Sequence, residues 1–448
     1  MINTLLIKNG TIFTHDKTIY NMDILIEDNK ISAIEANIIP EDSWPVIDAK
    51  GLYIIPGLVD MHCDLCEPGF DFKEDYISAG ESAINGGFTT ITNNPNTQPV
   101  IDNRAIVEYV LTKSKKESPV NVYPYGALSK GLKGLELAEI GEMQLAGVVA
   151  VSDGDVPIEN SGLIKSLFHY CSMFDIPIIL HCEDTQLSNG HGINDGFIAT
   201  QLGIIGAPEI AETVALTRNI LLAEAYNIHL HVCHVSTKKS VEIIRNAKKS
   251  GIRITAETSP QYFTLDETCL IEYNSLGKVN PPLRTKEDVQ AIIKGIGDGT
   301  IDVISSDHKP DTIDSKDIEF ELASYGISSF ETAFSLAYTK LVDTKVITLE
   351  QLINKMSFKP SQILAIPKGK IALDAIADIV IFDPEASFLV ESRNFKSKAN
   401  YSPYDGMILK GLIKYTIVNG KKYETNNDNV VLSSSDYDMS QFEGYGDY

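Results

Sequence analysis

Short apolar runs alternate with segments of helical length between about residue 55 and residue 364. Repeated βα units whose strands are apolar on both faces predict a parallel sheet, and this many units favours a closed (β/α)8 barrel. A doubly wound open sheet fits the same alternation, so the positions of the polar residues must separate the two folds. The apolar runs include residues 89–92, 120–123, 147–151, 176–181, 229–234, 252–257 and 301–307.

Aspartate and histidine residues follow these runs at their carboxyl ends. In a barrel those ends share one mouth, where catalytic residues come from several strands. The polar positions therefore favour the barrel and predict a site at its mouth. The residues concerned are His62, Asp64, Asp153, His181, His234 and Asp307.

The stretch Pro56–Gly69 carries the first of these polar groups. The apolar run 52–59 leads directly into Asp60, His62 and Asp64, which alternate along the chain. Residues two apart on a strand point to the same face, so the pattern predicts that the three side chains converge on one point. The alternative is a strand whose end carries solvated polar residues.

The two ends of the chain have a different pattern. Residues 1–54 and 365–425 consist of short β-like runs separated by turn signals, with no helix-length segment between the runs. We expect one small, discontinuous β domain built from both ends, with the barrel spanning residues 55–364. Residues 426–448 contain five acidic residues and no basic one, which predicts a disordered tail.

Composition excludes some classes of partner and location. The net charge of −23 would repel nucleic acid and anionic membranes. No apolar run approaches the ~18 residues of a membrane span, and the N-terminal residues lack the features of a secretory signal, so the expected location is the cytoplasm. The six cysteines, including the C-x-x-C of Cys63 and Cys66, fit reduced thiols better than a disulfide framework.

Three motifs carry a resemblance to a known family. They are Asp60-x-His62 with Glu67-Pro-Gly69, the segment 83–90, and Pro95-Asn-Thr97. Over about residues 4–422 the chain resembles the type I dihydroorotase branch of the amidohydrolase superfamily. The resemblance implies a TIM-type barrel with a small β-sandwich-like domain, one or two Zn²⁺ ions, hydrolysis of a cyclic amide in pyrimidine synthesis, and a cytoplasmic homodimer.

The resemblance also implies a set of metal ligands. His62, His181 and His234 match metal-binding histidines, and Asp307 matches the residue that binds metal and shuttles the proton of the attacking water. Asp64 stands where the family has its second histidine, and its carboxylate is a competent zinc ligand. Without a gap the position of the bridging carboxylate falls on Gly154, and a shift of one residue places it on Asp153 or Asp155. We expect His229 and His231 to be packed or hydrogen-bonded.

The substrate side departs further from the family. Asn96 and Asn280 match residues that line the substrate pocket. The arginine and the histidine that hold the substrate carboxylate are replaced by Cys66 and Asp311. Losing these charge-assisted contacts is expected to weaken the binding of dihydroorotate.

Three functions remain open from the sequence. The first is a working dihydroorotase-like hydrolase, and the second is a catalytically silent relative that assembles with aspartate carbamoyltransferase. The third is an amidohydrolase of a neutral or cationic cyclic amide, for which Cys66 and Asp311 are suited. Metal content and turnover of dihydroorotate distinguish them.

Overall fold

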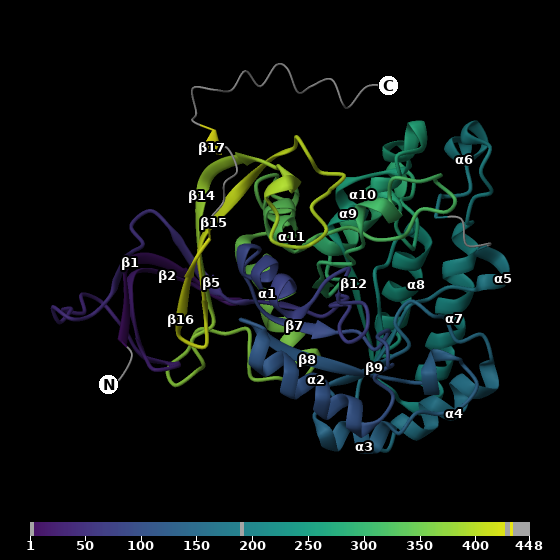
Figure 1. The fold of residues 1–448 in the computed structure, drawn as a ribbon, viewed down its shortest axis with the longest axis horizontal. Helices are drawn as coiled ribbons and strands as arrows, with labels where there is room; N and C mark the ends of the chain where they lie inside the picture. Colours follow the sequence, from purple (N-terminus) through teal and green to yellow (C-terminus); the bar gives the residue numbers. More distant parts are fainter. Residues whose placement is uncertain (1–3, 189–191, 426–430, 433–448) are drawn as a thin grey trace.

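A computed structural model describes residues 4–188, 192–425 and 431–432 (Figure 1). Its central element is a parallel eight-stranded sheet whose strands follow one another in chain order from β6 to β13. Both faces of these strands are buried, as their apolar sequences predict. The strands are β6 Leu58–Asp60, β7 Phe88–Asn93, β8 Asn121–Ala127, β9 Ala150–Ser152, β10 Ile178–Leu180, β11 Leu230–Val232, β12 Ile254–Thr258 and β13 Val303–Ile304.

The first and last strands of this sheet meet just beyond their carboxyl ends. Cys63 and His308 form an isolated parallel bridge, and the amide N of Asp64 donates to the carbonyl O of His308 at 2.8 Å. This contact closes the sheet around its axis. The closed (β/α)8 barrel is therefore confirmed, and the doubly wound alternative is excluded.

Helices connect the strands and cover the outside of the barrel (Figure 1). Several begin at a side chain that caps the free N–H groups of the first turn: Asp75 for α1, Thr237 for α8 and Thr285 for α10. The helices are α1 Tyr76–Asn85, α2 Arg104–Glu117, α3 Ile140–Ala146, α4 Ser161–Cys171, α5 Thr185–Ser188, α6 Phe197–Leu202, α7 Glu209–Tyr226, α8 Lys238–Lys249, α9 Pro260–Thr264, α10 Lys286–Gly297, α11 Phe330–Ala337, α12 Leu349–Ile353 and α13 Lys359–Ile363.

A second sheet combines both ends of the chain and lies beside the barrel (Figure 1). In it β5 pairs with β1 on one side and with β14 on the other, so strands from the two ends share one hydrogen-bonded ladder. Its own apolar core contains Ile24, Ile54 and Ile379. The strands are β1 Thr4–Phe13, β2 Thr18–Glu27, β3 Lys30–Glu35, β4 Val46–Asp48, β5 Tyr53–Pro56, β14 Ile379–Leu389, β15 Ile408–Val418, β16 Lys421–Glu424 and β17 Val431–Leu432.

The apolar run 52–59 is two strands, where the sequence predicted one. β5 belongs to the end sheet and β6 to the barrel, and Gly57 separates them. Gly57 lies so close to the next strand that a Cβ there would come within 2.2 Å of Thr89 Oγ1. The break therefore lies where the chain passes from one sheet to the other.

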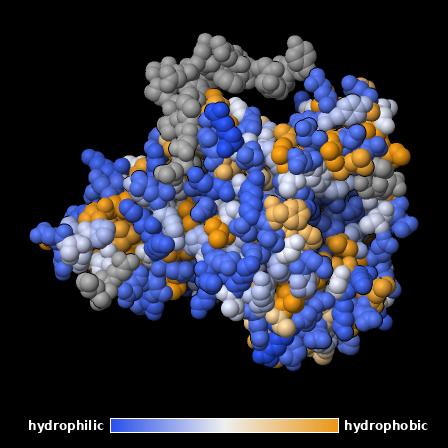
Figure 2. Space-filling view, in the orientation of Figure 1, coloured by the Kyte–Doolittle hydropathy of each residue, from blue (hydrophilic) through white to orange (hydrophobic). Residues whose placement is uncertain are grey.

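Within the described residues, no helix has both the length and the apolar character that crossing a bilayer requires. Figure 2 shows a mostly hydrophilic face, with hydrophobic side chains gathered near α6, where Phe197 and Ile205 are exposed. Of the predicted disordered tail, residues 426–430 and 433–448 lie outside the described residues, whereas Val431–Leu432 pairs with β14.

Candidate metal centre at the mouth of the barrel

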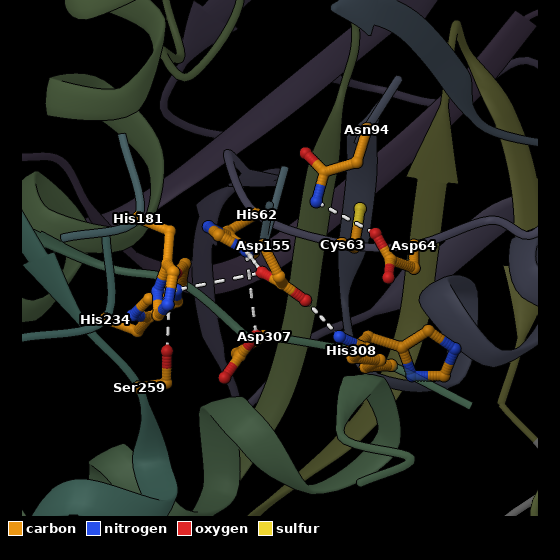
Figure 3. Close-up of polar contacts among 12 residues, drawn as sticks. His62, Cys63, Asp64, Asn94, Asp155, His181, His234, Ser259, Asp307 and His308 are labelled. Carbon is orange, nitrogen blue, oxygen red and sulfur yellow. Dashed lines mark hydrogen bonds and ion pairs between the residues drawn. The ribbon is translucent and has the colours of Figure 1, made fainter. Parts of the chain in front are cut away.

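The carboxylate of Asp155 lies at the centre of the barrel mouth, between residues from different strands (Figure 3). Its Oδ1 is 3.9 Å from His62 Nε2, beyond β6, and 3.9 Å from His234 Nε2, beyond β11. Its Oδ2 accepts a bond from the ammonium group of Lys309. Burial opposes ionisation of Asp155, but Lys309, His234 and His62 outweigh it and hold the pKa of the carboxyl well below its ordinary value.

Asp153, the first of the two candidates for the bridging residue, points away from this centre. Its carboxylate accepts bonds from the amide N–H groups of Leu128 and Ser129 at 2.7 and 2.9 Å and from Ser129 Oγ at 2.5 Å. These three bonds tie the end of β9 to the segment after β8. The structure therefore brings Asp155, and not Asp153, next to the histidines.

His181 and Asp307 complete the group around Asp155. His181 Nδ1 is 3.2 Å from His234 Nε2, and Asp307 Oδ1 is 3.8 Å from His62 Nε2. Burial raises the pKa of Asp307 to about 7, with Asp155 and Glu257 adding to the rise while His62 and Lys309 oppose it. A carboxyl with a pKa near neutrality is suited to accepting and returning a proton at physiological pH.

Two carboxylates, the buried Glu257 and the partly exposed Glu183, orient the histidines from behind. Glu257 of β12 is 2.8 Å from His62 Nδ1 and 3.2 Å from His231 Nε2, and Glu183 is 2.8 Å from His181 Nε2. Burial opposes ionisation of Glu257, but bonds from His231 and His62 outweigh it and hold its pKa well below the ordinary value. A carboxylate behind a ligating imidazole fixes the ring and its tautomer, which leaves the other nitrogen free for a metal.

Glu257→Gln is expected to lower affinity for Zn²⁺ by about 10- to 100-fold, the usual cost of losing such a partner. The amide keeps the size of the side chain but removes the negative charge that holds His62. Metal affinity measured by competition with a chromophoric chelator tests this expectation. Glu267→Gln is the matched control, because Glu267 bonds to Asn194 away from the centre and should leave the affinity unchanged.

Two neighbouring histidines have supporting contacts. His231 and His229 both bond to Thr255 Oγ1, at 2.9 and 3.0 Å. The prediction that they are hydrogen-bonded is confirmed. Asn280, which the resemblance places in the substrate pocket, donates from Nδ2 to Glu183 at 3.0 Å, beside His181.

Asp60 and Asp64 do not converge with His62, because β6 ends at Asp60 and the alternation stops there. Asp60 accepts bonds from Ser306, which links β6 to the segment after β13. Asp64 accepts bonds from Asn94 Nδ2 at 2.9 Å and Asn96 Nδ2 at 3.0 Å and lies apart from the three histidines (Figure 3). The predicted ligand Asp64 thus has both oxygens engaged by amide donors.

A cavity of about 120 Å³ adjoins the centre on the side of Asp64. Cys66 and Asp311 line it, as the sequence predicts, together with Asn96, Lys309 and Tyr325. The carboxylate of Asp311 is paired with Lys73 at 2.7 Å. None of the described residues that line the cavity is an arginine, and its two lysines are paired with carboxylates, Lys73 with Asp311 and Lys309 with Asp155.

Two buried lysines anchor the segment that carries Lys309 and Asp311. Lys278 Nζ donates to the carbonyls of Phe320, Glu321 and Ala323 at 2.7, 3.0 and 2.8 Å. Lys316 is fully buried, and its Nζ lies 3.3 and 3.4 Å from two carbonyls and 5.8 Å from the centre of the Tyr401 ring. Burial lowers the pKa of Lys316 to about 7.

This burial predicts a pH dependence of stability. Between about pH 7 and the ordinary lysine pKa near 10, the unfolded chain binds a proton at Lys316 that the folded chain does not. Lys316 alone should therefore make the free energy of unfolding rise with pH, by up to about 1.4 kcal/mol per pH unit. Urea unfolding of Lys316→Met between pH 7 and 10 should show a flatter dependence, whereas the exposed Lys286→Met should retain the wild-type slope.

The backbone is strained at the centre. His234 and Asp307 have φ values of 29° and 51°, in a region that non-glycine residues rarely adopt. Such conformations cost about 1–3 kcal/mol each and cluster at functional sites. Here they turn both side chains into the mouth directly after β11 and β13.

The donor set fits a divalent metal ion. Imidazole nitrogens and carboxylate oxygens are the ligands that zinc takes, and the rings of His62 and His181 are held from behind as ligating histidines are. A thiol also lies here: His62, Cys233 and His234 each offer a donor atom within 4.8 Å of the others. Burial raises the pKa of Cys233 to about 12, so at neutral pH it is a thiol.

Sequence reasoning missed three residues of this site. Lys309, Glu257 and Lys73 are not among the predicted site residues. The position of Glu257 one residue from the end of an apolar run was the available signal. No signal in the sequence pairs Lys73 with Asp311, which lie 238 residues apart.

Comparisons with known proteins agree with this arrangement. The family model described as Dihydro-orotase-like matches residues 51–240. The chain is 49% identical over 417 residues to a dihydroorotase of Ruminiclostridium cellulolyticum, covering 93% of this chain and 97% of that protein. It is 48% identical over 418 residues to a dihydroorotase of Acetivibrio thermocellus, covering 93% and 98%.

A solved structure shares the whole fold. The L-hydantoinase (dihydropyrimidinase) of Arthrobacter aurescens superposes with a TM-score of 0.86 at 26% identity, covering 96% of this chain and 98% of that one. The resemblance in sequence, the closed barrel and the relatives at nearly half identity agree. The chain belongs to the dihydroorotase family of the amidohydrolase superfamily.

Proposed function

We propose that the chain is a metal-dependent hydrolase that interconverts dihydroorotate and N-carbamoyl-aspartate. The observation that carries the proposal is the convergence of His62, His181, His234, Asp155 and Asp307 at one barrel mouth. The dihydroorotase relatives over nearly the whole chain support the substrate class. Zn²⁺ is the proposed ion, because imidazole and carboxylate donors suit it.

The chain's own residues supply the acid–base part of the reaction. When bound, a divalent ion would polarise the scissile carbonyl and make water a stronger nucleophile. Asp307 takes the proton of the attacking water and returns it to the leaving amide nitrogen. Gln261 Nε2 donates to Asp307 Oδ2 at 2.6 Å and thereby leaves Oδ1 facing the centre. General acid–base catalysis of this kind contributes about 10²- to 10⁴-fold.

One observation favours a different substrate. The cavity beside the centre offers Cys66 and the Lys73–Asp311 pair where a carboxylate would have to bind. A neutral or cationic cyclic amide would not need the missing arginine. This second candidate keeps the same centre and the same roles for Asp307 and Asp155, and it differs only in the cavity.

Turnover by the Zn²⁺-loaded protein tests these proposals. Dihydroorotate and an uncharged cyclic amide such as dihydrouracil are assayed in parallel at neutral and alkaline pH. Hydrolysis of dihydroorotate supports the first proposal, and hydrolysis of dihydrouracil alone supports the second. Absence of both activities in protein that carries its metal would overturn both.

The catalytically silent relative, the remaining alternative from the sequence, predicts a different result. A silent relative would fold normally, load no metal and co-purify with aspartate carbamoyltransferase. Metal analysis of the purified protein therefore separates it from both hydrolases. The homodimer and the cytoplasmic location implied by the resemblance also remain predictions, which sedimentation and cell fractionation test.

A further inference from the structure

The two oxygens of Asp155 face different cations. Oδ1 faces the imidazoles of His62 and His234, where a divalent ion would bind. Oδ2 bonds to the ammonium group of Lys309, which follows β13. A carboxylate that bridges two metal ions through both of its oxygens offers one to each, so Lys309 occupies the side of Asp155 that a second ion would need.

Lys309 is held at this position by its backbone and its charge. Its amide N donates to Ile327 O at 3.0 Å, and Gly326 packs so closely that a Cβ there would lie 2.3 Å from Lys309 O. Asp64 and Asp307 attract the ammonium in addition to Asp155. Three carboxylates therefore share this single positive charge.

Asp64 stands where the family has its second histidine, and it lies on the same side of Asp155 as Lys309. Where a second histidine would offer an imidazole, Asp64 has its oxygens engaged by Asn94 and Asn96. The cation beside Asp155 works against a second metal at that point, whereas the donors that hold Asp64 are neutral amides, which a dication can displace. A second dication would also be repelled by the adjacent ammonium.

We propose that the ammonium group of Lys309 replaces the second metal ion, so that the site binds a single divalent ion on the His62–His234 side of Asp155. This inference rests on the proposed hydrolase site but concerns the number of ions and not the substrate. It assigns Lys309 a positioning role: the ammonium neutralises and orients Asp155 without a second ion.

The ion count of the purified chain tests the inference. Wild type, Lys309→Met and Lys309→Arg are saturated with Zn²⁺, passed through a desalting column and analysed by mass spectrometry for metal per chain. We expect one ion in wild type and Lys309→Arg and two in Lys309→Met, whose side chain has similar length but no charge. Lys73→Met removes the other lysine of the cavity and should keep one ion.

Loading with Mn²⁺ gives a second measurement that needs no turnover. The paramagnetic resonance spectrum should be that of an isolated ion in wild type and of a spin-coupled pair in Lys309→Met. Circular dichroism establishes that each variant is folded before ions are counted.

The outcomes separate this inference from the proposed function. Two ions per wild-type chain, no ion in it, or an unchanged count in folded Lys309→Met would overturn the inference. Wild type with two ions that hydrolyses dihydroorotate leaves the function standing. Wild type with one ion and no cyclic-amide hydrolysis overturns the function and leaves the inference standing.

Discussion

Asp155→Asn is expected to remove most of the bound metal and to lower kcat/KM for the hydrolysed cyclic amide by about 10³-fold or more, which corresponds to at least about 4 kcal/mol. Asp155 contacts His62, His234 and Lys309 at once. An amide keeps the shape but offers a neutral oxygen and a donor in place of an anion. Metal per chain and steady-state kinetics are measured together.

Asp153→Asn is the matched control, two residues away on the same loop. Its carboxylate accepts three bonds from Leu128 and Ser129 and does not reach the histidines. We expect a loss of about 1–3 kcal/mol in the free energy of unfolding and an unchanged metal content in the folded protein. If Asp153→Asn lost its metal while Asp155→Asn retained it, the assignment of the central carboxylate would be reversed.

Cys66→Arg combined with Asp311→His is expected to raise kcat/KM for dihydroorotate by about 10²- to 10³-fold. An arginine at 66 would present a planar pair of donors to the substrate carboxylate, and losing Asp311 removes a nearby anion. The buried charged contacts restored in this way are worth a few kcal/mol. Cys66 and Asp311 both line the cavity beside Asp64, so the new groups would lie on its wall.

The control for this gain is Cys66→Met combined with Asp311→Asn, which changes volume and removes the anion without adding a cation. A gain of similar size in the control would assign the effect to the loss of Asp311 alone. The double change to arginine and histidine must be assayed in protein with its full metal content. No gain there would contradict the account of the cavity as a site that lacks a carboxylate partner.

The barrel was predictable because its strands are buried on both faces, which leaves a repeated apolar signal. The break at Gly57 was not, because 52–59 is uniformly apolar and only pairing with β14 or β7 divides it. The pattern of apolar residues within one segment does not show with which of two sheets that segment pairs. The strands of the end sheet were predictable because turn residues separate them, in contrast to the unbroken apolar run 52–59.

The centre was predicted in part. His62, His181, His234 and Asp307 each follow an apolar run, and the barrel gathers such positions at one mouth. Asp153 and Asp155 follow the same run two residues apart, so only the fold of the loop decides which one faces inward. Contacts such as Lys309 to Asp155 join segments that lie far apart in the chain, and one sequence gives no signal for them.

The shared ladder of β5 and β14 affects how the polypeptide is made. β1 and β5 emerge from the ribosome early, but β14, which pairs with β5, is translated only after the whole barrel. The end sheet cannot be completed until β14 has been translated. Its strands therefore cannot fold as one unit in the order of synthesis. Nascent chains that stall before residue 379 would expose the unpaired, apolar edge of β5. We expect such chains to bind chaperones.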